Sequence, residues 1–195
     1  MCGGVTEKDL ALDVAQRVER VLQAHGLGTL MTRTGDAYIS LQDRAALTNR
    51  ANDCIFVSIH FNDTSRQGAN GVETYFAMHQ QEVTPALAAW LPFFHRASNE
   101  EATLESQSLA GFIQEAVVGR TKAVNRGTKA EQFYVIANVR HPAVLVEGGF
   151  MTNKEEIAKL ANGEYRESMA AAIAEGIDKY RQLLIQRAAA AVPRS

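Results

Sequence analysis

Cys54-Ile55-Phe56-Val57-Ser58-Ile59 is an almost unbroken apolar run, and His60 follows it directly. A run of this length with so little polar alternation is typical of a parallel strand that helices cover on both faces. Residues 143–146, Ala-Val-Leu-Val, form a second run of this kind, and Glu147 follows it. The two runs predict the centre of an α/β sheet, with a polar side chain where each strand is expected to end.

Helical patterns lie between the apolar runs. Thr6 and Asp9 can form a capping box, and apolar residues then recur at helical spacing up to Val21. Further helices are expected from Ser40, over residues 109–118, after Thr152 or Asn153, and over about residues 165–184. Shorter strands are expected at residues 27–32, 72–77 and 133–136. This alternation predicts a single α/β layer-sandwich domain, with a mainly parallel twisted sheet flanked by helices on both faces.

The domain is expected to occupy residues 1–185. Within it, residues 79–105 contain two prolines and three large aromatic residues, and we interpret them as an irregular insertion with some helix. The insertion is also a candidate regulatory segment. The alanine-rich residues 186–195 are expected to be a disordered tail.

Composition excludes several classes of protein. The chain has 195 residues, 46% of them hydrophobic and 22% charged, which is enough to form one real core. Its formal net charge of -2 gives no strong basic field, so we expect no nucleic-acid partner. No apolar run is long enough to predict membrane insertion. Cys2 and Cys54 are the only cysteines, which excludes a disulfide framework.

Three polar side chains are expected to meet at one edge of the sheet. Ligands of open α/β sheets bind beyond the carboxyl ends of the strands, where His60 and Glu147 are placed. Glu7 lies in the first turn of the first helix, and the start of that helix is expected at the same edge. Each residue also has an ordinary structural explanation: a hydrogen-bonded histidine, or a carboxylate that favours a helix start. Together they predict a site, without fixing its chemistry.

The chain resembles the zinc-dependent N-acetylmuramoyl-L-alanine amidases of bacterial cell-wall hydrolases and phage lysins. The resemblance covers about residues 3–181 in order and spacing, apart from the insertion. The segments that carry it are Glu7-Lys8-Asp9, Thr32-Arg33 with Asp36, Leu41, Arg44, Ala51-Asn52, Ser58-Ile59-His60-Phe61-Asn62, Gly71-Val72-Glu73, Arg126-Gly127-Thr128-Lys129, and Pro142 to Phe150 with Thr152-Asn153.

The resemblance implies a reaction and roles for particular residues. It implies that zinc-activated water hydrolyses the amide bond between N-acetylmuramic acid and L-alanine in peptidoglycan. Glu7 and His60 match two of the family's metal ligands, and Glu147 matches its catalytic glutamate. Asn62 and Arg126 are expected to contact substrate.

Simpler roles are expected for some other polar side chains. Arg126 and Lys129 are expected in a loop, where they could meet peptide carboxylates or simply be solvated charges. Glu73 is expected to be a supporting or structural carboxylate.

The sequence departs from the family at its start. The family's first zinc-binding histidine follows a first strand and precedes the glutamate ligand, whereas only six residues precede Glu7 here. We therefore expect that the first strand and one ligand are missing, and that this chain binds zinc poorly. His141 should lie at the opposite edge of the sheet and His25 at the far end of the first helix, so neither is expected to substitute.

The resemblance also implies partners and a location. The expected partner is peptidoglycan, together with a protein activator in some relatives, and the chain is expected to be a monomer. Because peptidoglycan lies outside the cytoplasm, we expect a periplasmic or extracellular protein of the cell wall. Two alternatives remain: a catalytically impaired peptidoglycan-binding or regulatory homologue, and a zinc carboxypeptidase-like enzyme that cuts peptide bonds.

Overall fold

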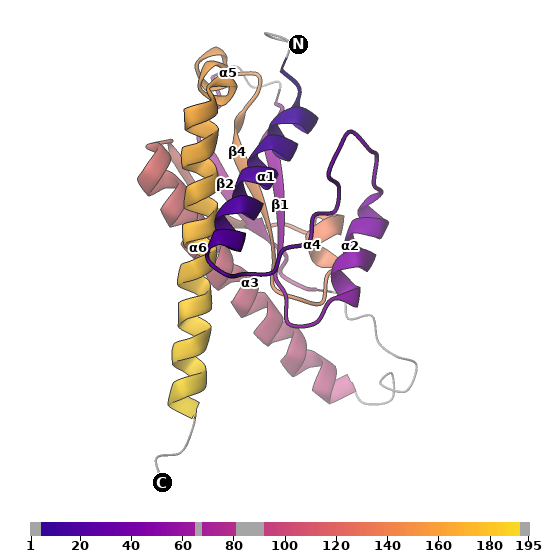
Figure 1. The fold of residues 1–195 in the computed structure, drawn as a ribbon. Coiled ribbons are helices and arrows are strands. Elements are labelled where there is room, and N and C mark those ends of the chain that lie inside the picture. Colours follow the sequence, from indigo (N-terminus) through magenta and orange to yellow (C-terminus); the bar gives the residue numbers. More distant parts are fainter. Residues whose placement is uncertain (1–4, 65–67, 81–91, 192–195) are drawn as a thin grey trace.

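A mainly parallel sheet forms the centre of the computed structural model, which describes residues 5–64, 68–80 and 92–191. Within these residues its four strands have the spatial order β1-β4-β2-β3. The strands are β1 (Phe56–Asn62), β2 (Val72–Phe76), β3 (Asn125–Ala130) and β4 (Ala143–Phe150). β1 pairs with β4 in parallel, as β2 does with β3, whereas β2 and β4 are antiparallel (Figure 1).

The helices begin where polar side chains can accept hydrogen bonds from the first turn. They are α1 (Glu7–Ala24), α2 (Leu41–Arg50), α3 (Pro92–Thr121), α4 (Tyr134–Ala137), α5 (Lys154–Ala161) and α6 (Gly163–Ala191). Thr6, Ser40 and Asn153 cap α1, α2 and α5 respectively, each through its side-chain oxygen. All three starts were predicted, because capping depends on residues within one turn of each other.

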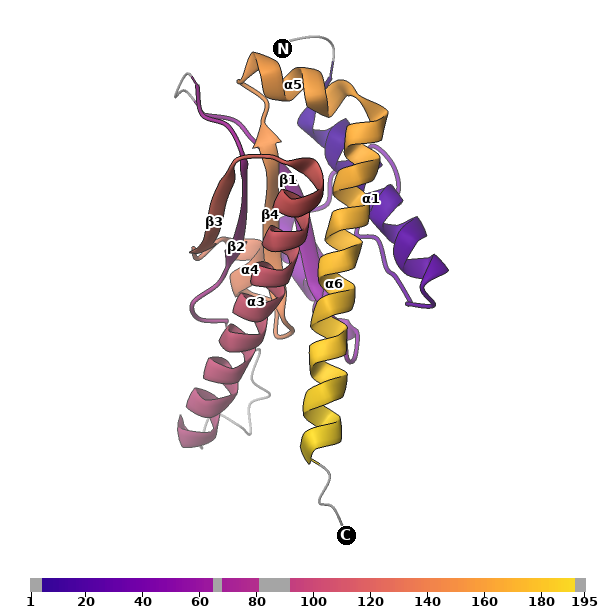
Figure 2. The same cartoon turned by 90° about the vertical axis from the view of Figure 1, so that its left-hand side faces the viewer.

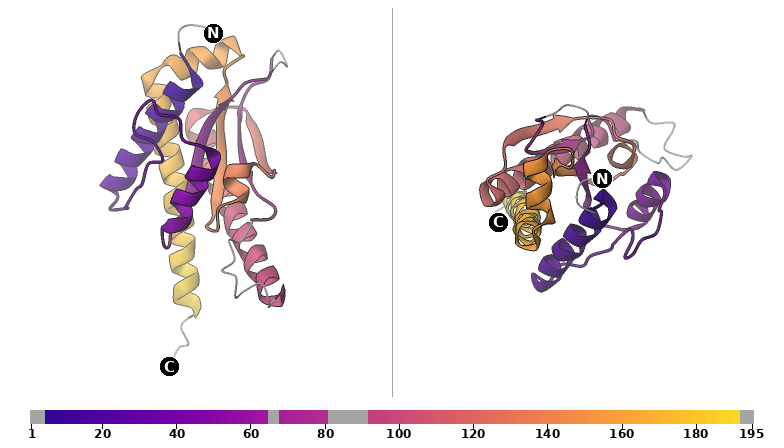
Figure 3. Two further views of the ribbon diagram at one scale, coloured as in Figure 1. Left: turned by 90° about the vertical axis from the view of Figure 1, so that its right-hand side faces the viewer. Right: turned by 90° about the horizontal axis from the view of Figure 1, so that it is seen from above.

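Helices cover both faces of the sheet, as the sequence predicted. Val144 and Val146 of β4 belong to the larger core, together with residues of α1, α3 and α6. Ala143 and Leu145 alternate with them and belong to a smaller core with residues of α2 and α4 on the opposite face. Figure 2 shows α3 and α6 in front of the sheet, and Figure 3 shows α2 on the other side.

Two predicted strands are wrong. Residues 27–32 are irregular and form no ladder; they line a hollow whose other walls include α1 and β1. Residues 134–137 form the short helix α4 instead of a strand. A run of four apolar residues fits either structure, and periodicity cannot decide between them.

Three other boundaries also differ from expectation. α3 begins at Pro92, so the helix expected within residues 79–105 is continuous with the one expected at 109–118, while residues 81–91 lie outside the described part. The expected disordered tail is helical as far as Ala191, because alanine has the highest helix propensity. Arg126 and Lys129 lie in β3, which corrects their expected placement in a loop. Among the described residues, no helix is long and apolar enough to span a membrane.

Candidate active site

Three charged or titratable residues form a row across neighbouring strands. His60 of β1 is the register partner of Glu147 of β4, and Glu147 is the partner of Glu73 of β2. Directly opposed residues point to the same face of a sheet, so these three side chains share one face. Leu145 lies two residues before Glu147, which makes this the face that α2 and α4 cover. The row begins where that apolar cover ends.

Both strands continue beyond the residues that were expected to end them. β1 runs on to Asn62 and β4 to Phe150, with an irregular register after His60. His60 and Glu147 therefore stand within the ladder instead of at its end. Paired residues precede and follow each of them along its strand, which restricts their positions more than a loop would.

Glu7 approaches this row from α1. Its Oε1 accepts a hydrogen bond from His60 Nδ1 at 2.8 Å and from the backbone N–H of Phe61 at 3.4 Å. The hydrogen bond from His60, together with its charge and the bond from Phe61, outweighs partial burial and holds the pKa of Glu7 below its ordinary value. The structure thus brings Glu7 and His60 together, 53 residues apart in the chain.

Glu147 occupies a different environment from the other carboxylates. Burial, opposed by His60 and reinforced by the charges of Glu7 and Glu73, raises the pKa of Glu147 from 4.5 to about 7. Its Oε2 is buried and has no hydrogen-bond partner among the described residues. A carboxylate with a pKa near neutrality can accept and release a proton under physiological conditions, which is the requirement for a general base.

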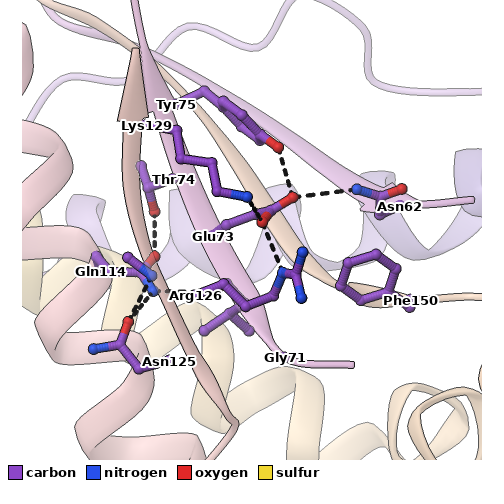
Figure 4. Close-up of polar contacts among 12 residues, drawn as sticks. Asn62, Gly71, Glu73, Thr74, Tyr75, Gln114, Asn125, Arg126, Lys129 and Phe150 are labelled. Carbon is purple, nitrogen blue, oxygen red and sulfur yellow. Dashed lines mark hydrogen bonds and ion pairs between the residues drawn. The ribbon is translucent and has the colours of Figure 1, made fainter. Parts of the chain in front are cut away.

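Glu73, the register partner of Glu147 on β2, is surrounded by hydrogen-bond donors (Figure 4). Its side chain is only 2% exposed. Oε1 accepts hydrogen bonds from the hydroxyl of Tyr75 at 2.6 Å and the amide of Asn62 at 3.4 Å. Oε2 accepts from Arg126 Nε at 2.7 Å and Lys129 Nζ at 2.5 Å. The sequence predicted a supporting or structural role for Glu73. No pattern in it indicated that Asn62, Arg126 and Lys129 converge on this carboxylate.

These contacts determine the charge of Glu73. Burial alone would raise its pKa, but the hydrogen bonds from Lys129, Tyr75 and Arg126 outweigh burial and hold the pKa below its ordinary value. Burial and the same carboxylate raise the pKa of the Tyr75 hydroxyl. Glu73 is therefore ionised at neutral pH, beside a glutamate that is not fully ionised.

Sequence reasoning missed two side chains that hold this framework together. Gln114 of α3 accepts a hydrogen bond from Thr74 of β2, and its amide donates to Asn125 of β3 at 2.8 Å (Figure 4). Glu156 of α5 is buried and accepts backbone hydrogen bonds from Gly71 and Phe150. A glutamine and a glutamate on amphipathic helices look like ordinary surface residues in a sequence, so no local signal could have found them.

The donors at the site fit zinc in kind. Histidine nitrogen and carboxylate oxygen are both common zinc ligands, and Glu7 and His60 offer one of each within contact distance. Over residues 5–64, 68–80 and 92–191, however, no three His, Cys, Asp or Glu side chains are grouped to hold a metal ion. Glu7 and His60 are thus two candidate ligands among the described residues, where a catalytic zinc ordinarily has three.

Two other histidines lie elsewhere, as expected. His141 Nε2 is 3.1 Å from the carbonyl of Ala51, before the start of β1. His25 follows α1 at its far end and pairs with Asp178. Neither contacts Glu7 or His60.

A histidine–carboxylate pair beside a glutamate of raised pKa, on one face of an α/β sheet, is an arrangement compatible with a hydrolase that activates water. Residues 1–179 match the N-acetylmuramoyl-L-alanine amidase family, and the chain belongs to that family. It is 33% identical over 177 residues to N-acetylmuramoyl-L-alanine amidase LytC of Bacillus subtilis, covering 91% of this chain but only 32% of LytC.

Solved structures agree with this assignment. N-acetylmuramoyl-L-alanine amidase AmiC2 of Nostoc punctiforme is 33% identical, with a TM-score of 0.76 over 93% of this chain and 87% of that one. An N-acetylmuramoyl-L-alanine amidase from Clostridium difficile 630 is 29% identical, with a TM-score of 0.76 over 92% and 86% of the two chains. The similarity extends over nearly the whole chain and is not confined to one motif.

Proposed function

We propose that this chain hydrolyses the amide bond between N-acetylmuramic acid and L-alanine in peptidoglycan. Family membership supports the choice of bond. The observation that carries the chemistry is Glu147, whose pKa is raised to about 7 and whose buried Oε2 has no partner among the described residues. Because peptidoglycan lies outside the cytoplasm, the proposed place of action is the cell wall.

The proposed mechanism gives each residue of the row one task. Glu7 and His60 would hold a zinc ion, which when bound polarises the scissile carbonyl and makes water more acidic. Glu147 accepts the proton of the attacking water and delivers it to the nitrogen of the leaving L-alanine. Its buried position keeps its pKa close to the pH at which both transfers must occur. Asn62 and Arg126 are proposed to contact the substrate from the edge of the row.

A second candidate is a peptidoglycan-binding or regulatory homologue with impaired catalysis. One observation favours it: among the described residues, no three His, Cys, Asp or Glu side chains are grouped to hold a metal ion. We therefore propose that the chain binds zinc weakly. Calorimetric titration with zinc tests this, using His60→Ala as the control that removes one ligand. A tight one-to-one site in the unmodified chain would contradict weak binding and favour full catalytic competence.

Digestion of purified cell walls with excess zinc tests the reaction itself. The expected products are stem peptides with L-alanine at a free amino terminus, identified by mass spectrometry. Glu147→Gln should abolish their release, whereas Glu164→Gln, at an exposed glutamate of α6, should not. Peptides cut at internal bonds would indicate a carboxypeptidase-like enzyme. Absence of any cleavage, with retained binding to the cell wall, would favour the regulatory homologue.

A further inference from the structure

Arg126 and Lys129 place two positive charges on one carboxylate oxygen. Both donate to Oε2 of Glu73, at 2.7 and 2.5 Å. One carboxylate compensates one of the two cations, so the group keeps a net positive charge. The Glu73 side chain is 2% exposed, whereas those of Arg126 and Lys129 are 35% and 39% exposed. The surplus positive charge is therefore on the solvent side of the group.

Both cations keep donors that no described residue uses. Arg126 donates to Glu73 through Nε, and the guanidinium lies over the ring of Phe150 at 4.9 Å from its centroid. Its Nη1 and Nη2 groups make no hydrogen bond within the described part of the chain. The ammonium of Lys129 has three donors, of which the bond to Glu73 uses one. Phe150 and Glu73 thus fix the plane of the guanidinium and leave its outer edge free to bind an anion.

The position of this pair relative to Glu147 limits what it can bind. Glu73 is directly opposite Glu147, and β3, which carries the two cations, is the next strand after β2. Two strand spacings are roughly 10 Å, or about three residues of extended peptide. An anion held by Arg126 and Lys129 would therefore lie within a few residues of the bond next to Glu147.

We infer that Arg126 and Lys129 form a binding site for a free carboxylate on the stem peptide, close to the scissile amide. This inference rests on the proposed function, because it takes the peptide side of that bond as the ligand. Glu73 acts as a positioning residue: it holds two mutually repelling cations side by side and fixes their direction. The consequence is selectivity, since a peptide whose carboxyl groups are amidated would bind more weakly than the free acid.

Binding of two matched compounds tests this selectivity without depending on catalysis. The probes are N-acetylmuramoyl-L-alanyl-D-glutamic acid and the same compound with both glutamate carboxyl groups converted to amides. Calorimetry is done on the full chain carrying Glu147→Gln, so that neither probe is cleaved. A charge-assisted contact predicts that the acid binds roughly tenfold to a hundredfold more tightly than the amide.

Variants at the two cations complete the test. Lys129→Met and Arg126→Gln should each bring the ratio of the two dissociation constants toward one, while Lys129→Arg should keep most of the preference. Arg120→Gln is the matched control, because Arg120 forms an ion pair with Glu175 on α3 and α6. Circular dichroism spectra and thermal unfolding of each variant show whether it is folded at the temperature of the titration.

The outcomes separate this inference from the proposed function. Three results would overturn the carboxylate site. The chain carrying only Glu147→Gln could bind acid and amide equally, or bind neither. Alternatively, the preference for the acid could be unchanged when Lys129→Met or Arg126→Gln is added. In those cases the two cations serve only to neutralise Glu73. Cleavage of cell walls by the chain with Glu147 intact is measured separately. A carboxylate preference in a chain that never releases stem peptides would overturn the proposed reaction and leave the binding site standing.

Discussion

Glu73 and Glu147 lie directly opposite each other across the antiparallel pair of β2 and β4, and their pKa values are shifted in opposite directions. Two like charges at opposed positions of a sheet are unfavourable if both ionise. The structure avoids this by giving Glu73 two cations and a hydroxyl, while Glu147 is buried without a partner among the described residues. One carboxylate therefore stays ionised, and the other is left able to exchange a proton near neutral pH.

Replacing Glu147 by glutamine should stabilise the metal-free chain at alkaline pH. A carboxyl group whose pKa rises from 4.5 to about 7 on folding takes up protons in the folded state, so stability falls as pH rises between these values. A shift of this size corresponds to roughly 3 kcal/mol, most of which is lost between pH 5 and pH 8. Urea unfolding in the presence of a chelator measures this at pH 5 and pH 8. The gain in unfolding free energy of Glu147→Gln over the unmodified chain should be larger at pH 8 than at pH 5 by about this amount. Glu164→Gln should show no such gain, and an equal difference at both pH values would contradict the prediction.

Replacing Glu73 by glutamine should have the opposite dependence on pH. Its pKa is lowered on folding, so it contributes stability above its ordinary pKa of 4.5 and loses that contribution as pH falls below it. At pH 7 the substitution removes charge-assisted hydrogen bonds and should cost roughly 1–3 kcal/mol. The stability difference between Glu73→Gln and the parent should shrink as the pH is lowered from 5 to 3. A constant difference across this range would show that Glu73 is not paired as described.

The central strands and helix starts could be predicted because their signals are local. The apolar runs that contain Val57 and Val144 need cover on both faces wherever they lie, and Thr6 and Ser40 cap helices within their own turn. Family resemblance added the pairing of Glu7 with His60. These parts of the site needed no knowledge of strand register.

The remaining features depend on register, which a single sequence does not specify. Only the pairing of β2 with β4 sets Glu73 opposite Glu147, and only the pairing of β2 with β3 brings Arg126 to Glu73. The segment 125–130 is polar and mostly exposed, so it lacks the apolar pattern of a strand, and its composition predicts a loop. Its strand structure comes from its neighbour β2, which outweighs its own composition.

Removing the carboxylate of Glu156 should destabilise the strand ends around the site. Its two oxygens accept the N–H groups of Gly71 at 2.8 Å and Phe150 at 2.7 Å. Glu156→Ala leaves both donors without an acceptor and should cost roughly 2–6 kcal/mol, because each unsatisfied buried group costs about 1–3 kcal/mol. Glu156→Gln keeps one good acceptor and should lose about half as much. Glu155→Ala, at the neighbouring exposed position, should change the unfolding free energy little. Equal losses in the alanine and glutamine variants would contradict this account.

Two glycine-to-alanine substitutions should have opposite effects on stability. A Cβ on Gly176 of α6 would lie 2.6 Å from the Cα of Ile113 on α3, a backbone atom that cannot move without separating the two helices. Gly176→Ala should therefore cost about 1–3 kcal/mol through overpacking. Gly119 of α3 has no atom within 4 Å of the same position. Gly119→Ala should instead stabilise the chain by about 0.5–1 kcal/mol, because alanine favours the helix more than glycine does. Chemical denaturation of both variants checks this, and destabilisation of similar size in the two would show that helix packing at Gly176 is not the cause.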